Sequence, residues 1–513
     1  MSRILFALTP QPPLPEGEGE QDLRPLAPGR GGWGVRAIPR GFALGVVLFL
    51  SSPAPGADPA RPPNIVVMMT DDQRFDYLSC AGHPFLKTPN MDRIAREGYR
   101  FTNMFVTNSL CAPSRASLMT GQYSHANGVL DNLGSKLKPD APWMPDELRK
   151  AGYEVAFVGK SHVPGHFRDK TWDYYFGFTG QGNYLKPVIA ESGPDGKIGP
   201  DKPYEGWMDD VTTAKAIEWM KRDRKKPFVL FLFFKAPHRQ WQPPSRYKDL
   251  YADAVVKKPA LWDDSGQGKP RAFLQAANMF GQYPDAKDYD GMVRDYCRCL
   301  TGADDNVGKV LKTLEDLKVY DDTAVFYTSD NGFFLGEWQR FDKRFMHEPS
   351  IRVPLLLKLP KNNSRIARAV GHNPTEMVLN LDLAPTILQL AGVQAPKAMH
   401  GRSMLPHVLI PPAGPLPPEW QPREAFLYEY FEFPDVSHNV NKNRGVRTTK
   451  WKFIHYYDPP FNFAQEFELY DLEHDPEERV NLANRPMMQP VMKELQAKMQ
   501  QLRKETGDMD VKP

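Results

Sequence analysis

Asp71 and Asp72 directly follow the apolar run NIVVMMT, and Asp330 and Asn331 follow a second apolar run in TAVFYTSDNG. Short apolar runs of this kind predict buried strands that end where the polar residues begin. Carboxylate and amide oxygens are the ligands that hard cations such as Ca²⁺ prefer, and carboxylates gathered in one pocket repel one another without a cation. The pattern predicts a divalent-cation site, although a pair of adjacent aspartates is also typical of a turn or a helix cap.

A second chemical pattern lies in the segment NSLCAPSRASLMTG at residues 108–121. Pro113 favours the first turn of a helix, which places Cys111 at the N-terminus of that helix. Free backbone N–H groups and the helix dipole make this position suitable for an anion or an ionised nucleophile, and Arg115 can fold back beside it. The segment therefore indicates a reactive cysteine next to an anion site. The alternative is a buried structural cysteine that opens a helix.

Two further apolar runs also end in residues that can do chemistry. YEVAFVGKSH ends in Lys160 and His162, and PFVLFLFFKAPH ends in His238. Such histidines serve as general acids or bases, or as hydrogen-bonded structural residues. Parallel strands gather their ligands at their carboxyl ends, so we expect all four strand ends to meet at one place.

The elements between these runs predict an α/β fold with a mostly parallel sheet. Two stretches whose apolar residues have helical spacing, 207–224 and 291–318, lie between the predicted strands. Residues 239–285 are polar and aromatic, and predict a long loop over the carboxyl edge. The Pro-rich stretch LIPPAGPLPPEW ends a main domain, 61–405, and begins a smaller C-terminal α+β domain, 406–513. We expect the smaller domain to carry an antiparallel sheet, with the strand-like runs REAFLYEYF and TKWKFIHYY, and to close with a helix near 487–504.

Composition narrows the class of protein and its destination. The chain has 513 residues and a formal net charge of only +3, which argues against a nucleic-acid-binding protein, and its 4 cysteines form no disulfide framework. Residues 1–34 predict a disordered extension or a misplaced start. Residues 35–57 combine basic, apolar and small residues like a secretory signal peptide, with a retained membrane anchor as the alternative. We expect an exported protein, periplasmic or secreted, or lysosomal or extracellular in a eukaryote, without stable membrane insertion.

The ordered motifs resemble those of the type I, formylglycine-dependent sulfatases of the alkaline phosphatase superfamily. C-x-P-S-R followed by LMTG carries the resemblance, and DD, GKSH, KAPH, SDNG and FDKRFMHEPSIRVP follow the same order along residues 63–513. Two departures are the missing aromatic residue before His162 and the Asn after Asp330, where many members have His. The resemblance implies an alkaline-phosphatase-like fold, and a maturation enzyme that oxidises Cys111 to formylglycine.

The resemblance also implies a role for each site residue. It implies a Ca²⁺ site, with Mg²⁺ as the alternative, and a set of catalytic residues. In the implied mechanism, a hydroxyl of the hydrated aldehyde at position 111 attacks the sulfur of the substrate. His238, with Lys343, protonates the leaving alcohol. His162 then takes a proton from the second hydroxyl. The implied metal ligands are Asp71, Asp72, Cys111, Asp330 and Asn331, and the implied catalytic residues are Cys111, Arg115, Lys160, His162, His238 and Lys343. Lys343 lies in a basic run that is also typical of a solvated face.

The implied substrate is a sulfate ester, and the sequence favours a sulfated carbohydrate. The KAPHRQWQPPSRYKDLY and C-terminal stretches are similar to those of N-acetylglucosamine-6-sulfatase-like and mucin-desulfating members. His438 and Arg444 could contact a sugar or lie in a strand-edge loop, and Trp241 could stack on a sugar ring or simply be packed. Two alternatives stay open: a phosphonate monoester or phosphodiester hydrolase of the same superfamily, and a non-catalytic glycan-binding homologue.

Overall fold

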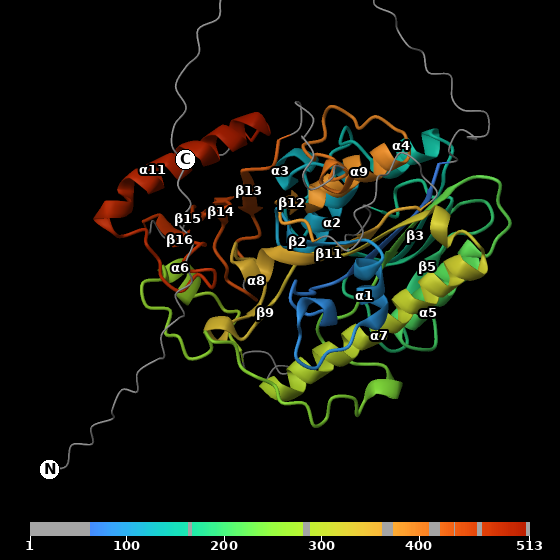
Figure 1. The fold of residues 1–513 in the computed structure, drawn as a ribbon, viewed down its shortest axis with the longest axis horizontal. Coiled ribbons are helices and arrows are strands. Elements are labelled where there is room, and N and C mark those ends of the chain that lie inside the picture. Colours follow the sequence, from blue (N-terminus) through green and yellow to red (C-terminus); the bar gives the residue numbers. More distant parts are fainter. Residues whose placement is uncertain are drawn as a thin grey trace, which may run out of the picture. The chain divides into compact units, whose positions relative to one another are not determined.

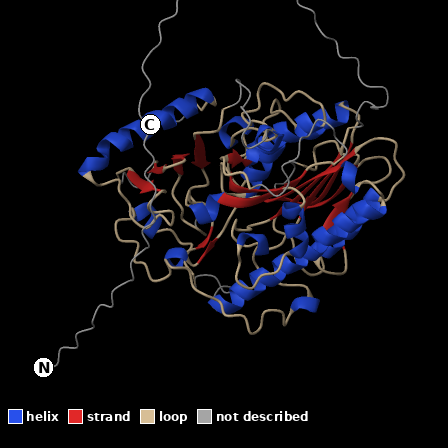
Figure 2. Ribbon diagram, in the orientation of Figure 1, coloured by secondary structure: helices blue, strands red, loops and turns tan. Residues whose placement is uncertain are grey.

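The computed structural model describes residues 62–162, 167–280, 288–361, 373–409, 421–435, 437–458 and 464–508. The predicted extension 1–34 and the predicted signal peptide 35–57 lie outside these ranges. Ten of the described strands form one large mixed sheet through the middle of the main body (Figures 1 and 2). In spatial order they are β12 (Val378–Leu379), β2 (Tyr99–Phe105), β11 (Arg352–Lys358), β8 (Thr323–Ser329), β1 (Asn64–Thr70), β7 (Phe228–Phe233), β3 (Glu154–His162), β4 (Tyr174–Thr179), β5 (Val188–Glu191) and β6 (Lys202–Pro203).

The centre of the sheet is parallel, as the sequence predicts. β8, β1, β7, β3 and β4 are neighbours, and their pairings with one another are parallel. Val67 of β1, for example, lies between Phe231 of β7 and Phe326 of β8, and all three side chains are fully buried. Strands buried on both faces need nearly continuous apolar sequence, which explains the uninterrupted runs. Because the four predicted strands are adjacent and parallel, their carboxyl ends meet at one edge.

Helices cover both faces of this sheet (Figure 1). Side chains alternate along β1: Val66 and Met68 pack into one apolar core with α1, α5 and α7, whereas Ile65, Val67 and Met69 pack into another with α2, α4 and α9. The helices predicted at 207–224 and 291–318 are confirmed as α5 and α7. The bounds are α1 (Pro89–Arg96), α2 (Cys111–Thr120), α3 (Ser124–Asn127), α4 (Met144–Lys150), α5 (Met208–Met220), α6 (Arg271–Leu274), α7 (Tyr289–Asp316), α8 (Glu348–Ile351), α9 (Leu383–Leu390) and α10 (Pro406–Leu409).

A separate antiparallel sheet follows near the C-terminus, as predicted. Its order is β13 (Ala425–Tyr430), β14 (Asn443–Thr448), β15 (Trp451–Tyr456) and β16 (Glu466–Asp471), and α11 (Gln489–Glu505) packs on its outer face (Figure 1). β14 and β16 are not among the predicted strands. β14 has one large apolar residue, Val446, whereas the alternation in β16, EFELYD, is a signal that the sequence interpretation missed. The predicted boundary between 405 and 406 stays a prediction, since most of the Pro-rich stretch lies outside the described residues.

The described part of the polar stretch 239–285 is a long connection, as expected. Where the structure describes it, as far as residue 280, it contains the short α6 and a single turn of 3₁₀ helix, Ser245–Tyr247. A small hairpin of β9 (Phe334–Leu335) and β10 (Phe341–Asp342) leads to Lys343. Among the described helices, none is long and apolar enough to cross a membrane.

Candidate active site

The carboxyl ends of the parallel strands bring most of the predicted site residues together. Asp71 and Asp72 follow β1, Asp330 follows β8, and the three carboxylates offer oxygens within 4.8 Å of one another. Lys160, near the end of β3, forms an ion pair with Asp71. His238 follows β7, and its Nε2 lies 3.7 Å from Asp72 Oδ2. These residues are almost completely buried, so their interactions take place largely out of contact with bulk water.

Arg115 lies at the centre of this cluster. Its guanidinium donates from Nε (2.9 Å) and Nη2 (2.7 Å) to Asp330 Oδ2, and from Nη2 to Asp71 Oδ2 at 3.1 Å. The three side chains have no solvent exposure in these ion pairs. Burial alone raises the pKa of Asp71, but the positive charges of Lys160, Arg115 and Lys343 hold it well below the usual value. Removing one partner of such a buried pair costs about 3–5 kcal/mol, so Arg115 fixes the position of both carboxylates.

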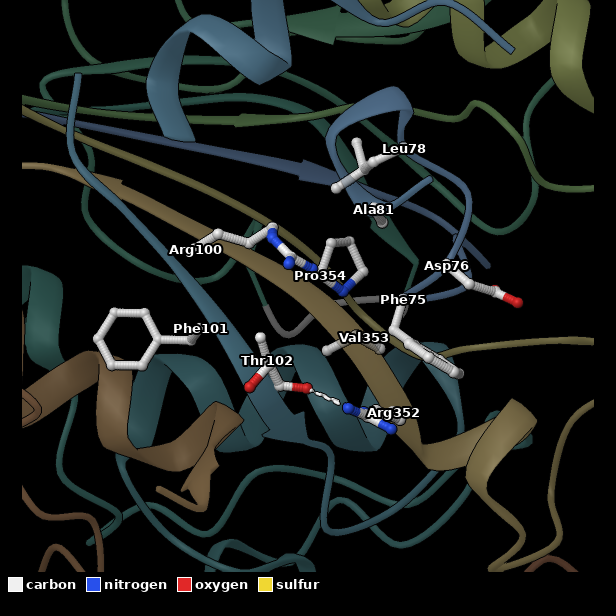
Figure 3. Close-up of a pocket in the computed structure, with 10 residues that line it drawn as sticks. All are labelled: Phe75, Asp76, Leu78, Ala81, Arg100, Phe101, Thr102, Arg352, Val353 and Pro354. Carbon is white, nitrogen blue, oxygen red and sulfur yellow. Dashed lines mark hydrogen bonds between the residues drawn. The ribbon is translucent and has the colours of Figure 1, made fainter. Parts of the chain in front are cut away.

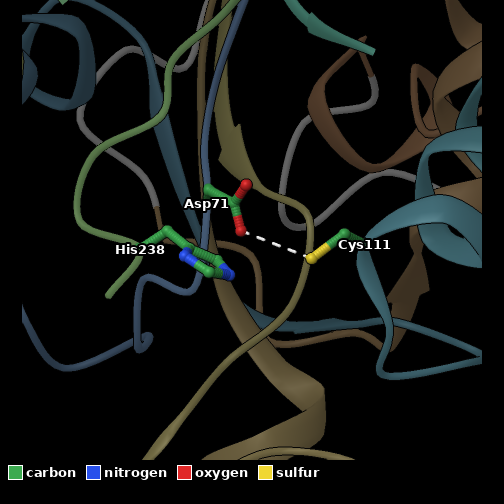
Figure 4. Close-up of side chains that lie close together, drawn as sticks. All are labelled: Asp71, Cys111 and His238. Atoms are coloured by element: carbon green, nitrogen blue, oxygen red, sulfur yellow. Dashed lines mark hydrogen bonds between the residues drawn. The ribbon is translucent and has the colours of Figure 1, made fainter. Parts of the chain in front are cut away.

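Cys111 is the first residue of α2 and is fully buried. Its Sγ lies 3.5 Å from Asp71 Oδ1 and 3.2 Å from Lys343 Nζ, which donates toward it. Figure 4 shows the sulfur, the Asp71 carboxylate and the His238 ring facing one another. Burial, and then the charge of Asp71, raises the pKa of the Cys111 thiol, so the unmodified thiol is neutral. The residue therefore has the predicted place at a helix N-terminus but is a poor nucleophile as a plain thiol.

The acidic cluster also fits a divalent cation. Asp72 Oδ2 and Asn331 Oδ1 are buried and find no hydrogen-bond partner among the described residues. Burial raises the pKa of Asp72 to about 7, with Asp71 and Asp330 adding to the effect and Lys343 opposing it. Burial and Asp71 likewise raise the pKa of Asp330. Oxygen atoms that are buried, unpaired and crowded by like charge are the donor set of a hard cation such as Ca²⁺.

Both predicted histidines lie at the site. His162 ends β3 in the left-handed backbone region, at φ 69°, and its buried Nδ1 has no hydrogen-bond partner in the described part of the chain. Burial, and then the charge of Lys160, lowers the pKa of His162 and of His238 well below the usual value. Asp72 has a similar backbone conformation, at φ 68°. Strained backbone of this kind persists where the surroundings hold it, and is typical of active sites.

Lys343 is buried rather than part of a solvated face. It forms an ion pair with Asp72, and the flanking residues Asp342 and Arg344 have positive φ angles of 86° and 91°. Arg344 forms ion pairs with Asp342 at 2.6 Å and with Glu432, which follows β13, at 3.1 Å. The sequence interpretation missed Asp342, Arg344 and Glu432. The only sequence signal was the run of three charged residues in FDKR, whose side chains are buried in the structure.

Of the other sugar-contact candidates, His438 lies at the site, Arg444 lies elsewhere, and Trp241 is packed behind the turn that carries His238. His438 Nε2 lies 3.2 Å from Asp342 Oδ2, next to Lys343. Arg444 instead stacks 3.6 Å from the centre of the Tyr457 ring, on the face of β14 toward α11. Trp241 is packed: it is 8% exposed, and its Nε1 donates to Pro237 O at 2.6 Å. Only His438 therefore remains a candidate for contact with the substrate.

Figure 3 shows a separate pocket, lined by residues from the loop after β1, from β2 and from β11. Arg352 donates to Thr102 O at 2.6 Å and lies over the Phe75 ring. None of the predicted site residues lines this pocket. Its lining residues are Phe75, Asp76, Leu78, Ala81, Arg100, Phe101, Thr102, Arg352, Val353 and Pro354.

Comparisons with known proteins agree with this geometry. Residues 63–393 match the sulfatase family model, and residues 336–505 match the model of the N-sulphoglucosamine sulphohydrolase C-terminal region. The chain is 34% identical to the N-acetylglucosamine-6-O-sulfatase of Bacteroides thetaiotaomicron, over 91% of each protein, and 29% identical to the human N-acetylglucosamine-6-sulfatase, over 75% of this chain and 72% of that protein.

Solved structures share the fold. A protein in complex with its substrate D-glucosamine-2-N,6-O-disulfate is 32% identical, with a TM-score of 0.77 over 88% of this chain and 99% of that one. The phosphonate monoester hydrolase of Agrobacterium radiobacter is 20% identical, with a TM-score of 0.69 over 86% of this chain and 96% of that one, which bears on the fold alone. With the buried acidic cluster, Cys111 at a helix N-terminus and matches along most of its length, the chain belongs to the sulfatase family of the alkaline phosphatase superfamily.

Proposed function

We propose that this sulfatase, which hydrolyses sulfate esters of carbohydrates, removes a 6-O-sulfate from a glucosamine-type sugar. The named activities of the bacterial and human relatives and the glucosamine disulfate complex of the solved neighbour support this choice of sugar. The main observation behind the proposed chemistry is that Cys111, at the N-terminus of α2, contacts both Lys343 and the Asp71 carboxylate.

Asp71, Asp72, Asp330 and Asn331 would hold a Ca²⁺ ion, with Mg²⁺ as the alternative, and residue 111 would complete the set. The unpaired oxygens of Asp72 and Asn331 support this assignment. When bound, the cation would neutralise the crowded carboxylates and the incoming sulfate oxygens. Arg115, held between Asp71 and Asp330, keeps the carboxylates in place in either state.

Position 111 supplies the nucleophile in this proposal. A maturation enzyme of the host would oxidise the Cys111 thiol to formylglycine, whose hydrated aldehyde offers a hydroxyl for attack on sulfur. Lys343, 3.2 Å from the sulfur atom of residue 111, would hold that group, and Lys160 would stabilise negative charge as the sulfuryl oxygens approach. The high pKa of the unmodified thiol is consistent with a need for this modification.

His238 and His162 would move the protons. The bridging oxygen of a sugar sulfate leaves as a strongly basic alkoxide, so a proton from His238 Nε2 would accelerate its departure. His162, with its unpaired Nδ1, would accept a proton from the second hydroxyl and release sulfate. Both rings are neutral in the substrate-free site because their pKa values are low, and the negative charge of a bound sulfate ester favours the protonated form of His238.

The sugar would lie against the charged residues beside Lys343. Asp342, Arg344 and His438 form a connected group there, and carboxylate, guanidinium and imidazole are suited to binding sugar hydroxyls. The side chain of His438 retains 15% exposure, so it can be reached from solution. These groups would select the sugar, whereas the cluster at the strand ends acts on the sulfate.

We also infer that the protein is exported before it acts. The predicted signal peptide at residues 35–57 supports this proposal, and N-terminal sequencing of the mature protein is its test. A mature protein that begins upstream of Val35 would contradict it.

The function is tested by peptide mass spectrometry across residues 96–144, combined with sulfate release from defined substrates. We expect formylglycine at position 111 in protein from the native host, and faster release from N-acetylglucosamine 6-sulfate than from its 3-sulfate isomer. Cys111→Ala should abolish turnover and leave the unfolding midpoint within a few degrees, because this substitution removes only one buried sulfur atom. Preferential cleavage of a phosphonate monoester or phosphodiester would favour the other hydrolase class, and an intact thiol without turnover would favour a glycan-binding protein.

A further inference from the structure

We infer that Asp209 is a positioning residue for His238, because it fixes the backbone of the turn 235–238 that carries the ring. Asp209 is the second residue of α5 and has no solvent exposure. The inference goes beyond the proposed site residues and rests on the proposed role of His238 as proton donor.

The Asp209 carboxylate binds two consecutive peptide groups of the turn. Its Oδ1 accepts the Lys235 N–H at 2.8 Å, and its Oδ2 accepts the Ala236 N–H at 2.9 Å. The Lys235 ammonium points elsewhere and donates to Gln181 O at 2.9 Å. One carboxylate that accepts both N–H groups sets the orientation of both peptide planes, just before the chain reaches His238.

Other hydrogen bonds tie the same turn to the site. Ala236 O accepts the Asp71 N–H at 3.0 Å, which links the turn directly to the acidic cluster. Tyr184, whose ring stacks on Trp207, donates its hydroxyl to His238 O at 2.7 Å. The remaining bonds of the turn are His238 N–H to Lys235 O at 3.0 Å and Trp241 Nε1 to Pro237 O at 2.6 Å.

A buried carboxylate is a costly way to hold a turn. Desolvation raises the pKa of Asp209 to about 7, although the two backbone donors oppose this shift. An amide side chain would cost less to bury, but it has one acceptor oxygen and would place an N–H₂ group against the second peptide N–H. The carboxylate is therefore the side chain that satisfies both donors at once.

The position of the turn decides where His238 can deliver its proton. The His238 Nδ1 faces Arg239 O, which leaves Nε2 directed toward the site, 3.7 Å from Asp72 Oδ2. In the proposed reaction the proton leaves Nε2 and bonds to the bridging oxygen while the S–O bond breaks, and the electron pair of that bond stays on the oxygen. A shift of the turn would move Nε2 away from that oxygen and slow this proton transfer.

The first experiment compares Asp209→Asn with Asp210→Asn, a matched change one residue further along α5. Asp210 is partly exposed and binds Arg246 at 2.6 Å, away from the turn. On the sugar sulfate that the wild type hydrolyses, Asp209→Asn should lower kcat about 10- to 100-fold with little change in KM. This loss is smaller than the roughly 10²–10⁴-fold contribution of general acid catalysis, because His238 is displaced rather than removed. On 4-nitrophenyl sulfate, whose leaving group needs no proton, the loss should be under about 3-fold. Asp210→Asn should match the wild type on both.

A double-mutant cycle separates positioning from a general effect on folding. On the sugar sulfate, Asp209→Asn combined with His238→Gln should be no slower than His238→Gln alone, because both changes remove the same proton transfer. If the two losses multiply, or if Asp209→Asn slows both substrates equally, Asp209 is structural and the inference is wrong.

Two further results complete the test. If His238→Gln slows both substrates equally, the proposed role of His238 is wrong, and the inference fails with it for that separate reason. If Asp209→Asn does not fold, Tyr184→Phe decides, because it removes only the hydroxyl that binds His238 O. We expect Tyr184→Phe to slow the sugar sulfate more than the aryl sulfate, and equal slowing of both would overturn the inference.

Discussion

Arg115, Lys160 and Lys343 together balance the acidic residues of the site. Arg115 pairs with Asp71 and Asp330, Lys160 pairs with Asp71, and Lys343 pairs with Asp72. Asp72 Oδ2 nevertheless accepts no hydrogen bond from the described residues, and burial raises the pKa of Asp72 to about 7. At the scale of single residues, the site therefore offers a cation a buried carboxylate oxygen that no hydrogen bond occupies.

Removal of the divalent cation should consequently lower both stability and activity. A cation at 100 times its Kd contributes about 2.7 kcal/mol to the folded state, so chelation should lower the unfolding midpoint by several degrees and stop sulfate release. Calcium should restore both. Differential scanning calorimetry with and without a chelator measures the change, and Asn331→Ala should need more Ca²⁺ for the same midpoint. An unchanged midpoint and unchanged activity after chelation would contradict the assignment of the site.

The end of β3 shows how an element places side chains that the sequence only suggests. Gly159, with φ 108°, allows β3 to approach β7 just before Lys160. A Cβ atom at residue 159 would lie 1.9 Å from Phe233 O. The pairing of β3 with β4 shifts in register between Lys160 and His162, at the point where the strand reaches the site.

Gly159→Ala should therefore damage both the strand and the site. The clash and the positive φ together predict a loss of at least about 3 kcal/mol in the free energy of unfolding. We also expect kcat to fall by more than the loss of folded protein accounts for. Gly134→Ala is the control, because a Cβ atom there meets nothing within 4 Å. Denaturant titration measures both variants. A Gly159→Ala protein as stable and active as Gly134→Ala would show that the close approach is not required.

At the scale of the whole molecule, the C-terminal region is joined to the main sheet by polar contacts. His125, in α3, pairs with Glu429 of β13, and its Nε2 lies 2.9 Å from Thr506 O, just beyond α11. Glu432 similarly binds Arg344 next to Lys343. The C-terminal sheet is therefore part of the support of the active site.

The His125 contact predicts a loss of stability at high pH. Burial disfavours the charged ring, but Glu429 and Thr506 raise its pKa from 6.5 to about 9. Because the pKa of His125 is higher in the folded state, its contribution to the free energy of unfolding is complete below pH 6.5. This contribution, up to about 3 kcal/mol, is lost as the pH rises through 9. Urea titrations at pH 6 and pH 10 measure this loss, and His125→Gln should show a smaller one. Parallel pH profiles for wild type and variant would rule the contact out as the cause.

Much of the fold could be predicted because its signals are local. The apolar runs that end at Asp71, Lys160, His238 and Asp330 are strands buried on both faces, and such strands leave a clear pattern. β14 leaves no such pattern, because it owes its conformation to pairing with β13 and β15.

The sequence by itself determined which residue types stand at the strand ends and at the start of α2, since these positions follow from periodicity and from Pro113. Only the tertiary structure decided which charges face one another: the sequence allowed Lys343 and Arg344 to be solvated, and gave no reason to connect Asp209 with the turn before His238. Hydrogen bonds and ion pairs between residues far apart in the chain depend on distances of a few ångströms, which the fold sets. Residue types thus define the available chemistry, and tertiary packing selects the groups that take part in it.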